Sequence, residues 1–189
     1  MSDMLSMKKN LAKILLDKSY MEGDFTLTSG RKSDYYFDCR QSSLNPEGAF
    51  LIGSIFYTML KDTNVQAVAG MTMGADPLVT ATSLVAFQNN RLLPALIVRK
   101  EAKKHGAGRA IEGLANVEKG APVILLEDVV STGGSVLKAC EHVHDAGLSV
   151  QGIFCILNRE EGGDDAIKAA GYPLHAIFTR RELLEAGRL

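Results

Sequence analysis

The chain has 189 residues, of which 46% are hydrophobic and 23% charged, the size and balance of one globular domain with a single core. Its 21 basic and 22 acidic side chains leave a formal net charge of -1, so no overall positive field attracts nucleic acid. No run approaches the roughly 20 apolar residues that span a bilayer, and residues 1–18 lack the apolar stretch and cleavage site of a signal peptide.

The first third of the chain predicts a helix, a hairpin and a second helix. Apolar residues recur at helical spacing through residues 4–15, which indicates an amphipathic helix. Two strand-like runs, Phe25–Leu27 and Asp34–Asp38, flank Ser29 and Gly30 and predict a hairpin. Asn45 followed by Pro46 predicts a capped helix start.

From residue 65 onward, short apolar strands alternate with amphipathic helices. In chain order, we expect a strand at 65–70, a helix at 77–88, strands at 95–99 and 122–126, a helix at 135–146, a strand at 150–157, a helix at 164–170 and a strand at 175–178. This alternation predicts an α/β fold with a parallel sheet covered on both faces. Ligands of such sheets bind beyond the carboxyl ends of the strands, so the candidate sites follow the strands. No repeat or linker divides residues 1–189, which we expect to form a single domain.

The three cysteines, Cys39, Cys140 and Cys155, are odd in number and widely spaced. We expect them to be reduced residues in or near the core, which places the protein in the cytoplasm.

The segment Val123–Ser135 is the strongest candidate site. An apolar strand leads to adjacent carboxylates and then to a small hydroxyl-rich loop and a helix; these residues are Glu127, Asp128, Val129, Val130, Ser131, Thr132, Gly133, Gly134 and Ser135. Glycines, hydroxyls and a helix N-terminus suit a phosphate, whereas the carboxylates suit sugar hydroxyls or hydrated magnesium. The segment is neither a Walker loop nor a dinucleotide fingerprint. An acidic strand end followed by an ordinary helix cap is the alternative interpretation.

Val123–Ser135 resembles the ribose-phosphate signature of the type I phosphoribosyltransferases. The resemblance implies that Glu127 and Asp128 bind the ribose hydroxyls and that the loop after them wraps the 5′-phosphate. It also implies the type I phosphoribosyltransferase fold, an α/β fold with a central mostly parallel sheet flanked by helices. A small hood is expected, contributed mainly by about residues 1–45 and the C-terminal segment.

A concentrated basic segment follows the strand at 95–99. Five of the eleven residues from Arg99 to Arg109 are lysine or arginine, and such a loop can close over a polyanion and stabilise a leaving pyrophosphate. A solvated loop with incidental lysines is the alternative. The segment resembles the catalytic loop of orotate phosphoribosyltransferases, which implies that Arg99, Lys100, Lys103 and His105 bind the pyrophosphate of the donor. With Asp128, Lys100 and Lys103 are the candidate catalytic residues, and the loop is expected to act across a homodimer.

Two further segments resemble the orotate pocket of that family. Phe-x-Leu-x-Ser-Gly from Phe25, followed by Ser-x-Tyr-Tyr, matches its N-terminal pattern and implies that Tyr36 borders orotate, with Ser131 nearby. Arginine binds carboxylates bidentately, and Arg159 resembles the family arginine that contacts orotate. The alternatives are aromatic side chains packed on the core and a surface arginine paired with a glutamate.

The segment Gly70–Pro77 matches the position of the family's pyrophosphate loop. Thr28 and Gly74 stand where one branch of the family has lysines, so two cations expected near orotate and pyrophosphate are missing. The pattern Gly-x-Thr-x-Gly-Ala-Asp-Pro resembles a second branch, so we expect activity to be retained.

The resemblance implies an enzyme of de novo pyrimidine biosynthesis that transfers ribose 5-phosphate from phosphoribosyl pyrophosphate (PRPP) to orotate, giving orotidine 5′-monophosphate and pyrophosphate. Magnesium is the expected cofactor, held mainly by substrate oxygens and water because no dedicated carboxylate cage is evident. Two alternatives are a purine phosphoribosyltransferase, which should lack the Arg99–Gly106 pattern, and a nucleic-acid-binding regulator, which should carry an added domain or a basic face.

Overall fold

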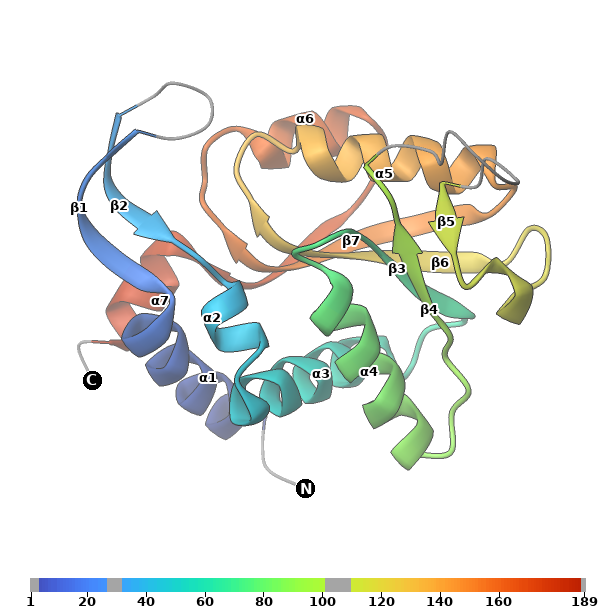
Figure 1. Ribbon diagram of the computed structural model, residues 1–189, viewed down its shortest axis with the longest axis horizontal. Helices are drawn as coiled ribbons and strands as arrows, with labels where there is room; N and C mark the ends of the chain where they lie inside the picture. The colour runs from blue at the N-terminus through green and yellow to red at the C-terminus, as the bar shows by residue number, and fades with distance from the viewer. Residues whose placement is uncertain (1–3, 27–31, 101–109, 188–189) are drawn as a thin grey trace.

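The computed structural model describes residues 4–26, 32–100 and 110–187. Figure 1 shows a twisted sheet between two layers of helices, with a separate hairpin at one side. The elements in chain order are α1 (Met4–Lys18), β1 (Tyr20–Thr26), β2 (Lys32–Phe37), α2 (Arg40–Ser43), α3 (Pro46–Leu60), β3 (Ala67–Met71), α4 (Asp76–Gln88), β4 (Ala95–Val98), β5 (Ile111–Glu112), a 3₁₀ turn (Leu114–Asn116), β6 (Pro122–Val130), α5 (Gly134–Asp145), β7 (Ser149–Asn158), α6 (Gly163–Ala169), β8 (Leu174–Thr179) and α7 (Arg180–Ala186).

The main sheet has the strand order β5-β4-β3-β6-β7-β8. The neighbours from β4 to β8 pair in parallel, and the two-residue strand β5 pairs antiparallel to the edge strand β4. The predicted α/β fold with a mostly parallel central sheet is therefore confirmed. The carboxyl ends of β3, β6 and β7 lie together, as parallel strands require.

Each face of the sheet carries its own apolar layer. In β6, Ile124 and Leu126 pack with α1, α3 and α4, whereas Val123 and Leu125 pack with α5 and α6. Successive side chains of a strand point to opposite faces, so a continuous apolar run can serve both layers. Figure 1 shows α5 and α6 on one side of the sheet and α3 and α4 on the other. Cys39, Cys140 and Cys155 are free and buried, as predicted.

The N-terminal elements gather beside one end of the sheet. The predicted hairpin is present as the antiparallel pair β1 and β2, and its turn at 27–31 lies outside the described residues. Helix α1 contacts α2, α3 and α7, so the first and last helices lie side by side (Figure 1). The hood expected mainly from about residues 1–45 and the C-terminal segment stays a prediction. Within residues 4–26, 32–100 and 110–187, no helix is both long and apolar enough to cross a membrane.

Local signals explain several boundaries. The Asn45 side chain accepts hydrogen bonds from the backbone N–H groups of Glu47 and Gly48, each at 3.1 Å, which caps α3 as predicted. Helix α7 was not predicted, although Thr179 and Glu182 form a capping box at its start. The predicted end of the strand at residue 126 is wrong, because β6 pairs with β7 as far as Val130 opposite Asn158. Glu127 and Asp128 therefore lie within the strand.

Candidate active site

A cleft of about 370 Å³ lies at the carboxyl ends of β3 and β6. Its walls come from the end of β2, the start of α2, the loop after β3, the loop after β6 and the end of β7. The predicted site residues that line it are Tyr36, Lys100, Glu127, Asp128, Val129, Ser131, Ser135 and Arg159. Segments separated by more than 100 residues in sequence thus meet in one place.

The loop after β6 forms a smaller pocket beside this cleft. Glu127 and residues 129–136 line it, and its volume is about 150 Å³. Gly133 has a φ of 83°, which strongly favours glycine. The backbone N–H of Gly163 donates to the Ser131 carbonyl at 2.9 Å, so the turn before α6 holds the loop from outside. The loop runs directly into the 12-residue helix α5, whose N-terminus is suited to bind an anion.

The adjacent carboxyl groups, buried at Glu127 and partly buried at Asp128, form an electrostatically unfavourable arrangement. Glu127 is 8% exposed, and its Oε2 has no hydrogen-bond partner among the described residues. Burial, and then the negative charge of Asp128, raise the pKa of Glu127 well above its usual value. Burial also raises the pKa of Asp128, although the Val129 N–H, which donates to Oδ1 at 2.8 Å, opposes that change. Hydroxyl donors or a cation from a ligand would relieve this cost.

The loop after β3 packs directly against Asp128. A β-carbon at Gly74 would lie 2.6 Å from Asp128 Oδ2, so a larger residue would displace the carboxylate. Nearby, the Thr72 hydroxyl donates to Asp76 Oδ2 at 2.9 Å, and the Thr72–Met73 peptide bond is cis. A lysine at position 74 would therefore collide with the Asp128 carboxylate in this loop conformation.

The basic residues predicted to bind pyrophosphate are only partly brought together. Lys100 lines the cleft. Arg99 does not line it; its Nη1 donates to Glu112 Oε1 at 2.7 Å on β5 in an exposed ion pair. Lys103 and His105 lie outside the described residues.

Arg159 is a buried arginine, 8% exposed, at the end of β7. Its Nε donates to the Tyr35 hydroxyl at 2.7 Å, and its Nη2 lies 3.0 Å from Glu161 Oε1. The guanidinium also lies 4.6 Å from the centroid of the Tyr35 ring. The pairing with a glutamate considered from the sequence is present, but it is buried and borders the cleft. Tyr36 also lines the cleft, with its ring centroid 5.6 Å from that of Phe25.

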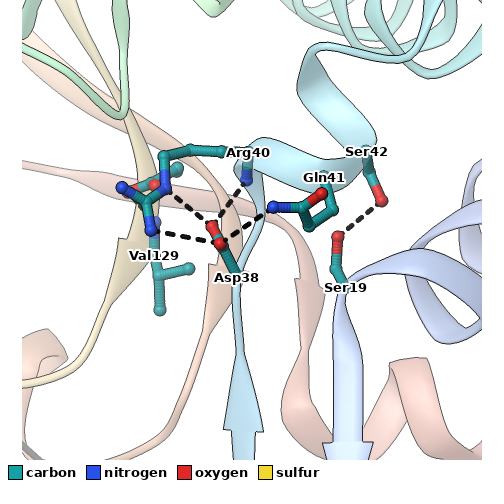
Figure 2. A network of polar contacts seen from close by, with 7 residues as sticks. Ser19, Asp38, Arg40, Gln41, Ser42 and Val129 are labelled. Atoms are coloured by element: carbon teal, nitrogen blue, oxygen red, sulfur yellow. Dashed lines mark hydrogen bonds and ion pairs between the residues drawn. The ribbon is translucent and has the colours of Figure 1, made fainter.

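Arg40 is a cleft residue that the sequence analysis missed. Its Nε donates to Asp38 Oδ1 at 2.7 Å and its Nη2 to Oδ2 at 3.1 Å. Gln41 donates to the same carboxylate at 3.2 Å. Figure 2 shows this network where β2 enters α2, with the Arg40 side chain extending toward the segment that carries Val129. An Asp-x-Arg sequence at a strand end is too common to indicate a site, so no local signal could have found it.

Comparisons with known proteins agree with this geometry. A family model described as the phosphoribosyl transferase domain matches residues 41–170. The chain is 46% identical over 180 residues to the orotate phosphoribosyltransferase of Sorangium cellulosum (strain So ce56), covering 95% of this chain and 94% of that protein. It is 43% identical over 182 residues to that of Nostoc sp. (strain PCC 7120), covering 96% and 87%.

A solved structure gives the same result. The orotate phosphoribosyltransferase of Mycobacterium tuberculosis H37Rv, in complex with 5-phospho-alpha-D-ribosyl 1-diphosphate, matches with a TM-score of 0.77 and 31% identity, covering 94% of this chain and 98% of that one. Because the family model matches more than half of the chain and both relatives match along nearly their whole lengths, the chain belongs to the orotate phosphoribosyltransferases, within the type I phosphoribosyltransferase family.

Proposed function

We propose that this chain transfers the ribose 5-phosphate group of PRPP to orotate, giving orotidine 5′-monophosphate and pyrophosphate in de novo pyrimidine biosynthesis. The observation that carries the proposal is the cleft itself. There the buried Glu127 with the partly buried Asp128, a glycine-containing loop at a helix N-terminus and a buried arginine lie together. These groups match the three parts of the reaction: a ribose, a phosphate and an anionic heterocycle.

The donor is bound by β6 and the loop after it. Backbone N–H groups and hydroxyls of the loop would hold the 5′-phosphate, in the pocket lined by Val129, Val130, Ser131, Thr132, Gly133, Gly134 and Ser135. Ribose hydroxyls would donate to Glu127 and Asp128, which gives the unpartnered Glu127 Oε2 a donor. This binding fixes C1′ of the ribose in the adjoining cleft.

Orotate is selected by the opposite wall of the cleft. Arg159 would donate to the orotate carboxylate, while Tyr36 and Ser131 would border the ring. Purines lack this carboxylate, so the buried arginine would have little use in a purine enzyme.

The reaction needs little covalent help from the protein. A ring nitrogen of orotate attacks C1′ as the bond to pyrophosphate breaks, so orientation and charge stabilisation are the main contributions. Lys103 and Lys100 would stabilise the charge that builds on the leaving group, with His105 binding the same group. Arg99 would exchange its exposed pairing with Glu112 for the same phosphate oxygens. Asp128 would hold the ribose in position while the pyrophosphate departs.

Magnesium is the proposed cofactor. Among the described residues no group of three His, Cys, Asp or Glu side chains could hold a metal, whereas the adjacent Glu127 and Asp128 carboxyls fit an ion held mainly by substrate oxygens and water. When bound, the ion would neutralise charge on the leaving pyrophosphate. The unpaired cysteines suit a cytoplasmic enzyme.

We also propose that residues 1–189 act as one domain and assemble as a homodimer, with the basic loop shared between subunits. Large apolar side chains are exposed on α3, α4 and the segment after α4, at Phe50, Leu84, Phe87 and Leu92. Figure 1 shows α3 and α4 side by side on the outside of the molecule. A second subunit would remove such surface from water.

An assay of orotate consumption tests the proposed reaction. The protein is incubated with PRPP, magnesium and orotate, and the loss of orotate absorbance is followed, with adenine, guanine, xanthine and uracil in parallel. We expect turnover of orotate alone. Lys103→Ala should lower kcat by about 10²–10⁴-fold if Lys103 stabilises the leaving group, whereas Lys104→Ala, which removes a neighbouring charge, should retain most activity. Turnover of a purine instead would show that the role given to Arg159 is wrong.

A further inference from the structure

Arg40 is a cation held in a fixed orientation at the wall of the cleft. Asp38 accepts from two of its five N–H donors, through Nε and Nη2. Both N–H groups of Nη1 and the second N–H of Nη2 take no part in this contact. The hydrogen bonds from the Arg40 side chain stabilise the ionised form of Asp38 and lower its pKa. The guanidinium is therefore oriented by one carboxylate while three donors stay available.

The other described arginines near the cleft already have partners, and Arg159 is the arginine proposed to bind the orotate carboxylate. Arg159 is engaged by Tyr35 and Glu161, and Arg99 is paired with Glu112 away from the cleft wall. The loop after β3 has glycine at its closest approach to Asp128 and contributes no cation there. Apart from Arg159, Lys100 and Arg40 are the described cations that line the cleft, and they can meet a ligand with several negative charges.

The location of Arg40 indicates which charged group of the substrates it can contact. Arg40 lines the large cleft together with Gly74 and Asp128. Burial raises the pKa of Asp128, and the positive charge of Arg40 partly opposes that rise. It does not line the smaller pocket formed by residues 129–136, where the 5′-phosphate is proposed to bind. Arg40, the loop containing Gly74 and Asp128 therefore meet in the part of the cleft that the smaller pocket does not include.

We infer that Arg40 binds the diphosphate group of PRPP and of the pyrophosphate product, with Asp38 and Gln41 as positioning residues. The inference rests on the proposed function for the identity of the ligand. It adds a rigidly held arginine on the body of the enzyme to the basic loop that follows β4. A guanidinium with free donors can bind two phosphate oxygens at once.

The test compares Arg40→Gln with wild-type enzyme in both directions of the reaction. PRPP and pyrophosphate carry the diphosphate group, whereas orotate and orotidine 5′-monophosphate do not. We expect KM for the first two to rise about tenfold, equivalent to about 1.4 kcal/mol, and KM for the other two to stay within twofold. Lys18→Gln is the matched control, because Lys18 borders a neighbouring groove with Arg40 but does not line the cleft. It should leave all four constants within twofold.

Calorimetric titration of pyrophosphate with magnesium gives a readout that does not need turnover. Weaker pyrophosphate binding by Arg40→Gln than by wild type supports the inference even if orotate proves not to be the substrate. Unchanged constants, or a rise confined to orotate and orotidine 5′-monophosphate, would overturn it. If Arg40→Gln does not fold, Arg40→Lys replaces it: this variant keeps the charge, loses the two-point contact with Asp38, and should show the same pattern with a smaller rise.

Discussion

At the scale of single residues, Arg159 depends on a residue far away in the chain. Its Nε donates to the hydroxyl of Tyr35, 124 positions earlier in the sequence, and both side chains are buried. Arg180, at the start of α7, also lies 4.1 Å from the centroid of the same ring. The hairpin and the C-terminal helix therefore orient the arginine proposed to bind orotate.

Removing the Tyr35 hydroxyl should weaken orotate binding selectively. In Tyr35→Phe the ring stays and the buried Nε loses its acceptor, a loss that costs about 1–3 kcal/mol. We expect KM for orotate to rise several-fold while KM for PRPP changes less than twofold, measured by steady-state kinetics. Tyr20→Phe, which alters the ring stacked on Tyr35, is the control. Equal changes in both Michaelis constants would contradict a positioning role for Tyr35.

At the scale of elements, the loop proposed to bind phosphate is supported by the turn between β7 and α6. A β-carbon at Gly163 would lie 2.6 Å from Val130 Cγ1 and 2.7 Å from the Ser131 carbonyl oxygen. The Asn158 amide also donates to Asp164 Oδ2 at 2.8 Å, which ties the end of β7 to α6. The shape of the loop is therefore set by a neighbouring element as well as by its own glycines.

Gly163→Ala should disturb the loop from outside. The new methyl group meets backbone that cannot move cheaply, so we expect a loss of stability of about 1–3 kcal/mol and a rise of tenfold or more in KM for PRPP. Urea denaturation and steady-state kinetics measure the two effects. Ala169→Gly, on an exposed position of the same helix, should cost about 1 kcal/mol without changing that KM. A normal KM in Gly163→Ala would show that the loop tolerates the shift.

At the scale of the whole molecule, the exposed apolar side chains on α3 and α4 favour association. Phe87 is 66% exposed near the end of α4 and Phe50 is 59% exposed on α3. Single exposed apolar residues are ordinary, but several on two packed helices suit a subunit interface.

A charge at this surface should separate the subunits. We expect Phe87→Glu to change the mass in solution from dimer to monomer, measured by light scattering, and to lower activity because the basic loop then lacks a neighbouring site. Leu5→Glu, at an exposed position on α1, should leave the mass unchanged. A monomeric wild-type enzyme with full activity would rule out a loop shared between subunits.

The amino-acid sequence by itself determined the order of the longer strands and helices, the hairpin and the segment proposed to bind phosphate. Those features depend on periodicity, caps and glycines within a few residues of each other, as at Asn45 and at Val123–Ser135. Short elements, namely α2, β5 and the seven-residue α7, were missed because they are too short for periodicity to show.

Only the tertiary structure decided how distant side chains combine. It buried Glu127 beside Asp128, packed Gly74 against that pair, and brought Arg40 into the same cleft. It also turned Arg99 toward Glu112 and joined Arg159 to Tyr35. These contacts arise because strands distant in sequence end at the same edge of one sheet, and local propensity does not encode which side chains then meet there.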